Sequence, residues 1–108
     1  MNIFKLLEEI AKKKWTFRIM IGKMHGIYIV AKRDPVVTKD VNGCTMWTVV
    51  RFSEPVIAVR RNNTVIFQAR AKANIMGVEI PVYEVYEYSG DGEISVEKNV
   101  VRIKEQIC

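Results

Sequence analysis

The chain has 108 residues, of which 49% are hydrophobic and 27% charged, and its formal net charge is +5. These proportions exclude a disordered chain and predict a single folded domain over residues 1–108. No apolar run approaches the roughly 20 residues of a membrane-spanning helix, and the N-terminus lacks the pattern of a signal peptide. We therefore expect a cytoplasmic protein without a membrane partner.

The charge is divided unevenly along the chain. Met1 to Lys72 has a balance of +9, fourteen bases against five acids, and Ala73 to Cys108 has a balance of −4, three bases against seven acids. This division favours a polyanion on one side of the molecule and a basic partner, or a second copy of the chain, on the other.

Two cysteines, Cys44 and Cys108, form no CxxC pair, and the chain has one histidine. They cannot supply the four ligands of a structural zinc site, so we expect no metal and no cofactor. The spacing favours reduced thiols in an intracellular protein, with a free thiol at Cys108 and a disulfide between two chains as the alternative. Only two glutamines occur among many Ile, Val, Lys, Arg and Glu residues, which resembles thermophile usage.

The first predicted element is a helix. Apolar residues recur at helical spacing from Ile3 to Ile10, and Asn2 is placed to cap the start. Lys12, Lys13 and Lys14 follow where the helix dipole is negative, so a helix end explains these cations better than a nucleic acid does.

From Trp15 the apolar period changes to two, which predicts a hairpin of Trp15–Ile21 and Ile27–Arg33. With residues 23–25 as the loop, Ile21 faces Ile27 and the large apolar residues gather on one face. The opposite face then carries Arg18, Met20, Tyr28, Val30 and Lys32.

The pair Asn42-Gly43 predicts a tight type I′ turn between strands Val36–Val41 and Cys44–Phe52, with Val41 opposite Cys44. One face of this second hairpin is apolar. The opposite face carries Thr38, Asp40, Thr45, Trp47, Val49 and Arg51.

A third hairpin is predicted from Val56–Arg61 and Thr64–Lys72 around Asn62-Asn63, residues that tolerate positive φ. A further strand, Val78–Tyr88, contains Pro81, which suits an edge strand or a bulge. The less apolar face of the third hairpin carries Ile57, Val59, Arg61, Ile66, Gln68, Arg70 and Lys72.

Beyond a turn at residues 89–92, the apolar residues from Val96 to Ile107 are spaced at four, three and four. This spacing predicts a C-terminal helix capped by Ser95, with a strand through Val100–Ile103 as the alternative. The predicted fold class is α+β. It is a strongly bent antiparallel sheet, or a small partly closed barrel, of about seven short strands flanked by an N-terminal and a C-terminal helix.

The polar faces of the three hairpins share one feature, bases interleaved with aromatic residues or methionine. Cations beside exposed rings bind single-stranded nucleic acid through phosphate attraction and base stacking. We therefore expect a small basic protein that binds single-stranded DNA or RNA largely independently of sequence. The alternative is an ordinary solvated face whose rings are covered by a helix. The predicted nucleic-acid-binding residues are Arg18, Tyr28, Lys32, Trp47, Arg51, Arg61, Arg70 and Lys72.

The acidic C-terminal third supports a second hypothesis, a protein-interaction or assembly module. In it, strand Val78–Tyr88 offers an unpaired edge to a second copy, forming a homodimer, or to a host protein. The predicted interface residues are Tyr83, Glu84, Tyr86, Glu87 and Tyr88.

An enzymatic function has the weakest support. His25 lies in a turn, and no nucleophile is tied to it by sequence. Glu79, Glu84 and Glu87 fall on both faces of one strand, so they would not converge on a metal without a bulge at Pro81. The sequence favours a binding protein over an enzyme.

Overall fold

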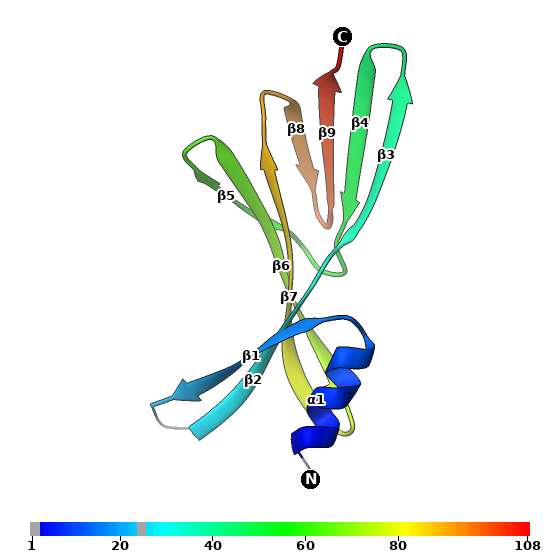
Figure 1. Ribbon diagram of the computed structural model, residues 1–108. Helices are drawn as coiled ribbons and strands as arrows, with labels where there is room; N and C mark the ends of the chain where they lie inside the picture. The colour runs from blue at the N-terminus through cyan, green and yellow to red at the C-terminus, as the bar shows by residue number, and fades with distance from the viewer. Residues whose placement is uncertain (1–2, 24–25) are drawn as a thin grey trace.

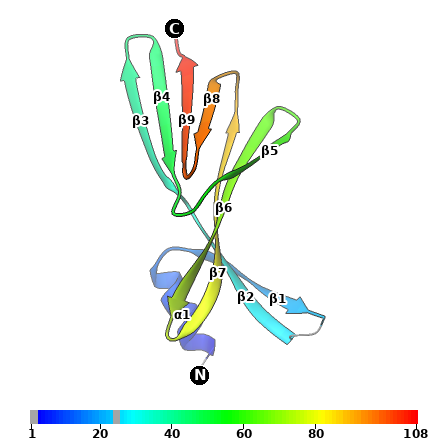
Figure 2. The same cartoon turned by 180° about the vertical axis from the view of Figure 1, so that it is seen from behind.

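The computed structural model describes residues 3–23 and 26–108 of the chain. These residues form two sheets, sheet A with strand order β1-β2-β7-β6-β5 and sheet B with strand order β3-β4-β9-β8 (Figures 1 and 2). The elements are α1 (Ile3–Lys12), β1 (Thr16–Gly22), β2 (Gly26–Arg33), β3 (Val36–Asn42), β4 (Thr45–Arg51), β5 (Ile57–Arg61), β6 (Thr64–Ile75), β7 (Val78–Ser89), β8 (Glu93–Glu97) and β9 (Val100–Gln106).

The predicted α+β class with a helix at each end is wrong. The part of the chain that the structure describes is mostly β, with 67% of its residues in strands, one short N-terminal helix and two sheets, neither of them closed. The predicted cap Asn2 lies outside the described residues. The sheet is also not purely antiparallel, because β2 runs parallel to β7.

The C-terminal segment is the hairpin β8–β9, not a helix. Val101 and Ile103 are fully buried, while Arg102 between them is only half-buried. Burial of alternate β-branched residues is the period of a strand, and here it prevails over the helical spacing. The turn between the strands places Lys98 at φ 53°, and the strand alternative through Val100–Ile103 is the one that the structure contains.

The long hairpin β6–β7 contributes residues to both ends of the molecule. Each of its strands has 12 residues, and their pairing runs without a break from Thr64–Ser89 to Ile75–Val78. The hairpin extends through an elongated molecule of 54 × 28 × 21 Å (Figure 1). Two hydrophobic cores lie on it, one at each end.

We call the end that contains sheet B the two-sheet half. Its core packs the inner face of sheet B on the odd-numbered residues of β6. It consists of Val50, Phe52, Val65, Phe67, Ala69, Tyr88, Val101 and Ile103.

We call the other end the helix half. There α1 packs through Leu6 and Ile10 on the same face of sheet A that sheet B covers further along. Ala31, Ile75, Ile80 and Val82 complete this core. The hairpin β1–β2 extends beyond the helix as an arm, and its tip residue Ile21 is 83% exposed (Figure 2).

The predicted register is confirmed for two hairpins and shifted in the third. Ile21 pairs with Ile27 in the first, and Arg61 pairs with Thr64 in the β5–β6 hairpin, where Asn62 has φ 56°. In β3–β4, Val41 pairs with Met46 instead of Cys44, because the turn is Gly43-Cys44 and not Asn42-Gly43. A shift of two residues leaves every side chain on its predicted face.

Cys44 and Cys108 form a disulfide within the chain, so the predicted free thiol at Cys108 is wrong. The pairing of β4 with β9 brings the two residues together, and the Ile107 amide donates to the Cys44 carbonyl at 2.8 Å. Because both cysteines belong to this disulfide, they do not indicate a reducing compartment. The described residues contain no helix with the length and apolar character needed to span a membrane.

Strand β7 is not the edge strand that Pro81 suggested. It lies between β6 and β2, and its partners on β2 are Ala31, Lys32 and Arg33. Pro81 directly precedes the first of these pairs, Ala31–Val82. Because proline has no N–H to donate, the parallel ladder stops there.

Candidate nucleic-acid interface

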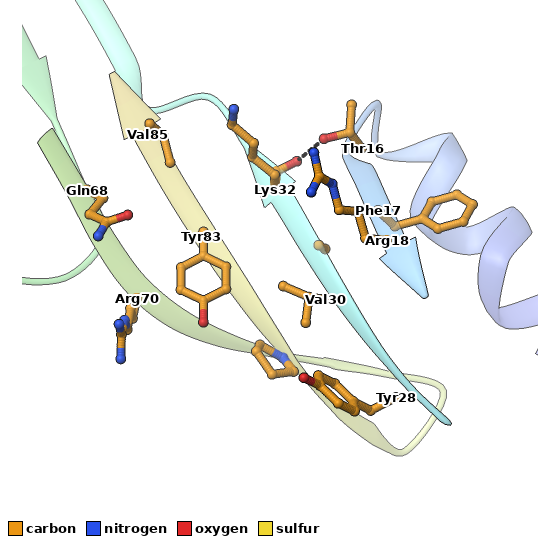
Figure 3. A pocket seen from close by; sticks show the side chains of 12 residues that line it. Thr16, Phe17, Arg18, Tyr28, Val30, Lys32, Gln68, Arg70, Tyr83 and Val85 are labelled. Atoms are coloured by element: carbon orange, nitrogen blue, oxygen red, sulfur yellow. Dashed lines mark hydrogen bonds between the residues drawn. The ribbon is translucent and has the colours of Figure 1, made fainter. Parts of the chain in front are cut away.

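One face of sheet A is covered neither by α1 nor by sheet B, and we call it the open face. Strand alternation places the even-numbered residues of β1, β2 and β6 and the odd-numbered residues of β7 on it. In the helix half this face is hollowed by a concavity of about 830 Å³ (Figure 3). Its lining consists of Thr16, Phe17, Arg18, Tyr28, Val30, Ala31, Lys32, Gln68, Arg70, Pro81, Tyr83 and Val85.

Aromatic rings and guanidinium groups meet in this hollow. The Arg70 guanidinium lies 5.7 Å from the centre of the Tyr83 ring, and the two residues are direct partners across the β6–β7 ladder. Figure 3 shows Tyr83 between Arg70 on one side and Val30 on the other. Tyr28 is 43% exposed at the far end of the hollow, so both rings are accessible to a flat ligand.

A hydrogen bond joins the start of β1 to β2 beside the hollow. The Thr16 hydroxyl donates to the Lys32 carbonyl at 3.4 Å, and the Arg18 side chain lies on the same face as Lys32 (Figure 3). The parallel pairing of Lys32 with Tyr83 on β7 places the basic residues of the arm beside those of the long hairpin, although the two are distant in sequence.

The charge in the hollow is positive. Of the twelve described lining residues, three are basic and none is acidic. Lys72 belongs to the same face, but its ammonium lies 3.6 Å from the Glu79 carboxylate, which offsets its charge. Arg61 is exposed on the same face at the far end of β5, outside the hollow. The field at this face therefore favours an anionic ligand.

Two predicted residues lie elsewhere. Trp47 and Arg51 are on the outer face of sheet B, separated from the open face by the core of the two-sheet half. Trp47 is 39% exposed, and the Lys104 ammonium lies 5.7 Å from the centre of its ring. The three hairpins thus do not form one continuous basic face, because the second hairpin belongs to the other sheet.

Two of the predicted interface residues have almost no exposed surface. Glu84 is 5% exposed and Tyr88 8%. Tyr86 is half-buried against the core of the two-sheet half, and Glu87 is exposed. Tyr83, which the sequence predicts as an interface residue and not as part of the nucleic-acid site, lines the hollow together with Arg70. Its pairing with Arg70 follows from the Met76-Gly77 turn, and that turn is the signal that would have revealed it.

Glu84 has a structural role at the junction of the two halves. Its carboxylate accepts hydrogen bonds from the Ser53 backbone N–H at 2.9 Å and from the Ser53 hydroxyl, and Arg33 Nε lies 3.5 Å away. The Arg33 guanidinium lies 5.0 Å from the centre of the Trp15 ring. A buried carboxylate with these partners is not available to an external ligand.

Tyr88 closes the end of the long hairpin. Its hydroxyl accepts a hydrogen bond from the Gly92 N–H at 2.9 Å. Burial raises the pKa of the Tyr88 phenol above its usual 10.0, nearby Glu105 and Asp91 raise it further, and the bond from Gly92 opposes them. The phenol is therefore neutral at physiological pH and acts as an anchor.

The three glutamates considered for catalysis do not converge on one side of β7. His25 lies outside the described residues. Glu79 and Glu87 are exposed on the open face, whereas Glu84 is buried on the opposite face of β7. Over residues 3–23 and 26–108, no three side chains of the metal-binding types come together.

Comparison with known proteins identifies no relative: no family model, no curated protein and no solved structure matches this chain.

Proposed function

We propose that the protein binds single-stranded DNA or RNA, largely independently of sequence, through the open face of sheet A. The observation that carries this proposal is the hollow in which Arg18, Lys32 and Arg70 surround the accessible rings of Tyr28 and Tyr83, with no acid among its described lining residues. Cations that attract phosphates and rings that stack on bases are the two parts of a single-strand site.

The shape of the face favours a single strand over a duplex. Tyr83 stands between neighbouring side chains inside the concavity, so a base must leave its stack to reach the ring. A free strand presents unstacked bases, whereas a duplex would have to be opened. Crossing four adjacent strands, the hollow is about 14 Å wide at the usual strand spacing of 4.8 Å, which suits a few nucleotides.

The test compares two triple variants with the same loss of charge. Arg18→Ala/Lys32→Ala/Arg70→Ala removes the bases of the hollow, and Lys5→Ala/Lys39→Ala/Arg51→Ala removes three exposed bases elsewhere. Affinity for labelled single-stranded oligonucleotides is measured by fluorescence anisotropy at several salt concentrations. Since each neutralised phosphate contributes about −0.7 to the log–log salt slope, the first variant should reduce the magnitude of the slope by about 2.

Wild-type protein that binds no oligonucleotide at low salt would refute the proposal. Equal losses in the two variants would show that binding depends on net charge and not on the hollow. Parallel titrations with DNA and RNA oligonucleotides of the same sequence identify the preferred nucleic acid.

As part of this proposal we place the protein in the cytoplasm, where nucleic acid is present. An intracellular disulfide is a known feature of proteins from hyperthermophiles, in agreement with the low glutamine content.

A second candidate function, assembly through acidic residues, is favoured by strand β8. This strand is an edge of sheet B, and its Glu93 and Glu97 are exposed. An acidic edge is complementary to the basic open face of a second copy. Light scattering at low salt should then detect a salt-sensitive oligomer that Glu93→Lys/Glu97→Lys abolishes, and a wild type that stays monomeric would exclude this function.

A further inference from the structure

Strands β2 and β7 form a fork in the middle of sheet A. They are paired only from Ala31–Val82 to Arg33–Glu84, and in the described structure residues 26–30 of β2 and 78–81 of β7 have no strand partner on the sides that face each other. Figures 1 and 2 show the β1–β2 arm diverging from the β6–β7 hairpin beyond this point. An unpaired inner edge of β2 leaves backbone N–H and C=O groups available for hydrogen bonds.

A hollow lies on each side of the fork. On the helix side, a groove of about 430 Å³ is lined mainly by apolar residues of α1, β2 and β7, among them Leu6, Ile29 and Ile80. On the other side is the basic hollow of the open face. Tyr28 and Pro81 line both, so the two hollows meet at the gap between the strands.

The two hollows differ in the chemistry that they accept. A strand added at the fork would continue the alternation of the sheet, so its side chains would point in turn to the helix side and to the open face. The first set would meet the apolar groove, and the second set would meet Arg18, Lys32 and Arg70. Specificity by pockets for alternate side chains, with affinity from main-chain hydrogen bonds, is the pattern of strand addition.

We propose that the fork binds an extended acidic peptide segment of a partner protein, in which apolar and acidic residues alternate. Charge complementarity identifies this occupant. Three bases line the open side, and Glu79, the one acid among the described lining residues of the groove, lies 3.6 Å from the Lys72 ammonium. The peptide pairs chiefly with β2, because Pro81 lacks the N–H that β7 would contribute there.

A nucleic acid and the peptide would contact different surfaces of sheet A. A nucleic acid would use the bases and rings of the open face alone. The peptide also needs the free backbone of β2 and the apolar groove on the helix side of the fork. Variants of the groove therefore distinguish the two ligands without changing any lysine or arginine of the open face.

The experiment uses two labelled peptides of equal composition, each with capped ends and eight residues. In one, valine and glutamate alternate; in the other, four valines precede four glutamates. The full chain should bind the alternating peptide at least about tenfold more tightly, because the second peptide cannot satisfy both hollows while it pairs with β2. Hydrogen exchange of the β2 amides that face the fork should slow by a similar factor on addition of the alternating peptide.

A matched pair of protein variants locates the binding. Ile3→Glu places a carboxylate at the lip of the groove, where Ile3 is 42% exposed, and should weaken the alternating peptide about tenfold. Val41→Glu makes the same change at an exposed position of sheet B, and the affinity should be unchanged. Circular dichroism confirms that both variants are folded.

Equal affinity of the two peptides, or no slowing of exchange in β2, would overturn the inference. So would an Ile3→Glu variant that binds as the wild type does. If an oligonucleotide binds but neither peptide does, the inference is overturned and the proposed function stands. If the alternating peptide binds but no oligonucleotide does, the inference stands and the proposed function is refuted.

Discussion

The two halves of the molecule share the hairpin β6–β7 but differ in how they cover it. In the two-sheet half, a complete second sheet packs on the hairpin, and Phe67, Val50, Val101 and Ile103 are fully buried between the layers. In the helix half, the cover is a helix of 10 residues, and the arm beyond it leaves Ile19 and Ile21 exposed.

This difference separates stability from binding. A sheet that matches its partner in width excludes water from the whole interface, whereas a single helix of about 10 Å diameter covers only about two strands. In the helix half the arm also diverges from the long hairpin, and the hollow and the fork both lie where the two separate. We therefore expect the two-sheet half to provide most of the free energy of unfolding and the helix half to provide the ligand sites.

The largest effect should come from the core of the two-sheet half. Phe67→Ala removes a fully buried ring and should lower the free energy of unfolding by about 3–5 kcal/mol, measured by chemical denaturation. The control Ile21→Ala, at the exposed tip of the arm, should change it by less than about 0.5 kcal/mol. Similar losses in both variants would contradict the division between the halves.

The disulfide should have the next largest effect. Cys44 and Cys108 are separated by 64 positions, so the double variant Cys44→Ala/Cys108→Ala should lose about 2–4 kcal/mol of unfolding free energy. A reductant should destabilise the wild type by a similar amount and leave the double variant unaffected. If the double variant is as stable as the wild type, the disulfide contributes nothing to the two-sheet half.

A smaller effect is expected at the turn that follows β7. A Cβ added at Gly92 would lie 2.6 Å from the Tyr88 hydroxyl and 2.9 Å from the Lys104 carbonyl oxygen. Gly92→Ala should therefore cost about 1–3 kcal/mol in a thermal or chemical melt. The control is Gly22→Ala in the arm, where the nearest atom is a Tyr28 ring carbon at 3.4 Å, and this variant should be nearly as stable as the wild type. If Gly92→Ala is as stable as the wild type, the turn can move away from β9.

The smallest effect on stability is expected for Trp47, which is partly exposed on the outer face of sheet B. Trp47→Ala should cost about 1 kcal/mol or less and leave oligonucleotide affinity unchanged, whereas Tyr83→Ala should weaken that affinity by about 1–3 kcal/mol. Anisotropy titrations of the two variants provide the comparison. A loss of oligonucleotide affinity in Trp47→Ala would show that sheet B is part of the binding site.

Local signals in the sequence are sufficient for the faces of the first three predicted hairpins and for the register of two of them. The alternation around Ile21 predicted the first register, and Asn62-Asn63 predicted the β5–β6 turn. Trp47 was placed on the correct face of its own hairpin. Alternation within a hairpin does not reveal which sheet the hairpin joins, so the sequence could not show that Trp47 and Arg70 lie in different layers.

The remaining errors have a similar origin. The spacing of Val96, Val100, Ile103 and Ile107 fits a helix, and only the core supplied by Phe67 and Val50 selects the strand that buries Val101. The disulfide depends on the pairing of β4 with β9, two strands that are distant in the sequence, for which no local signal exists. The fork likewise depends on a parallel pairing between distant strands.

The arrangement of the hairpin β6–β7 also has a consequence for how the chain folds. Its strands are joined by the two-residue turn Met76-Gly77 and pair along their whole length, so this hairpin can form through local contacts alone. The pairings of β2 with β7 and of β4 with β9 each close a loop of about fifty residues, which costs entropy and slows their formation. The hairpin should therefore form first, as the template on which the two halves assemble independently.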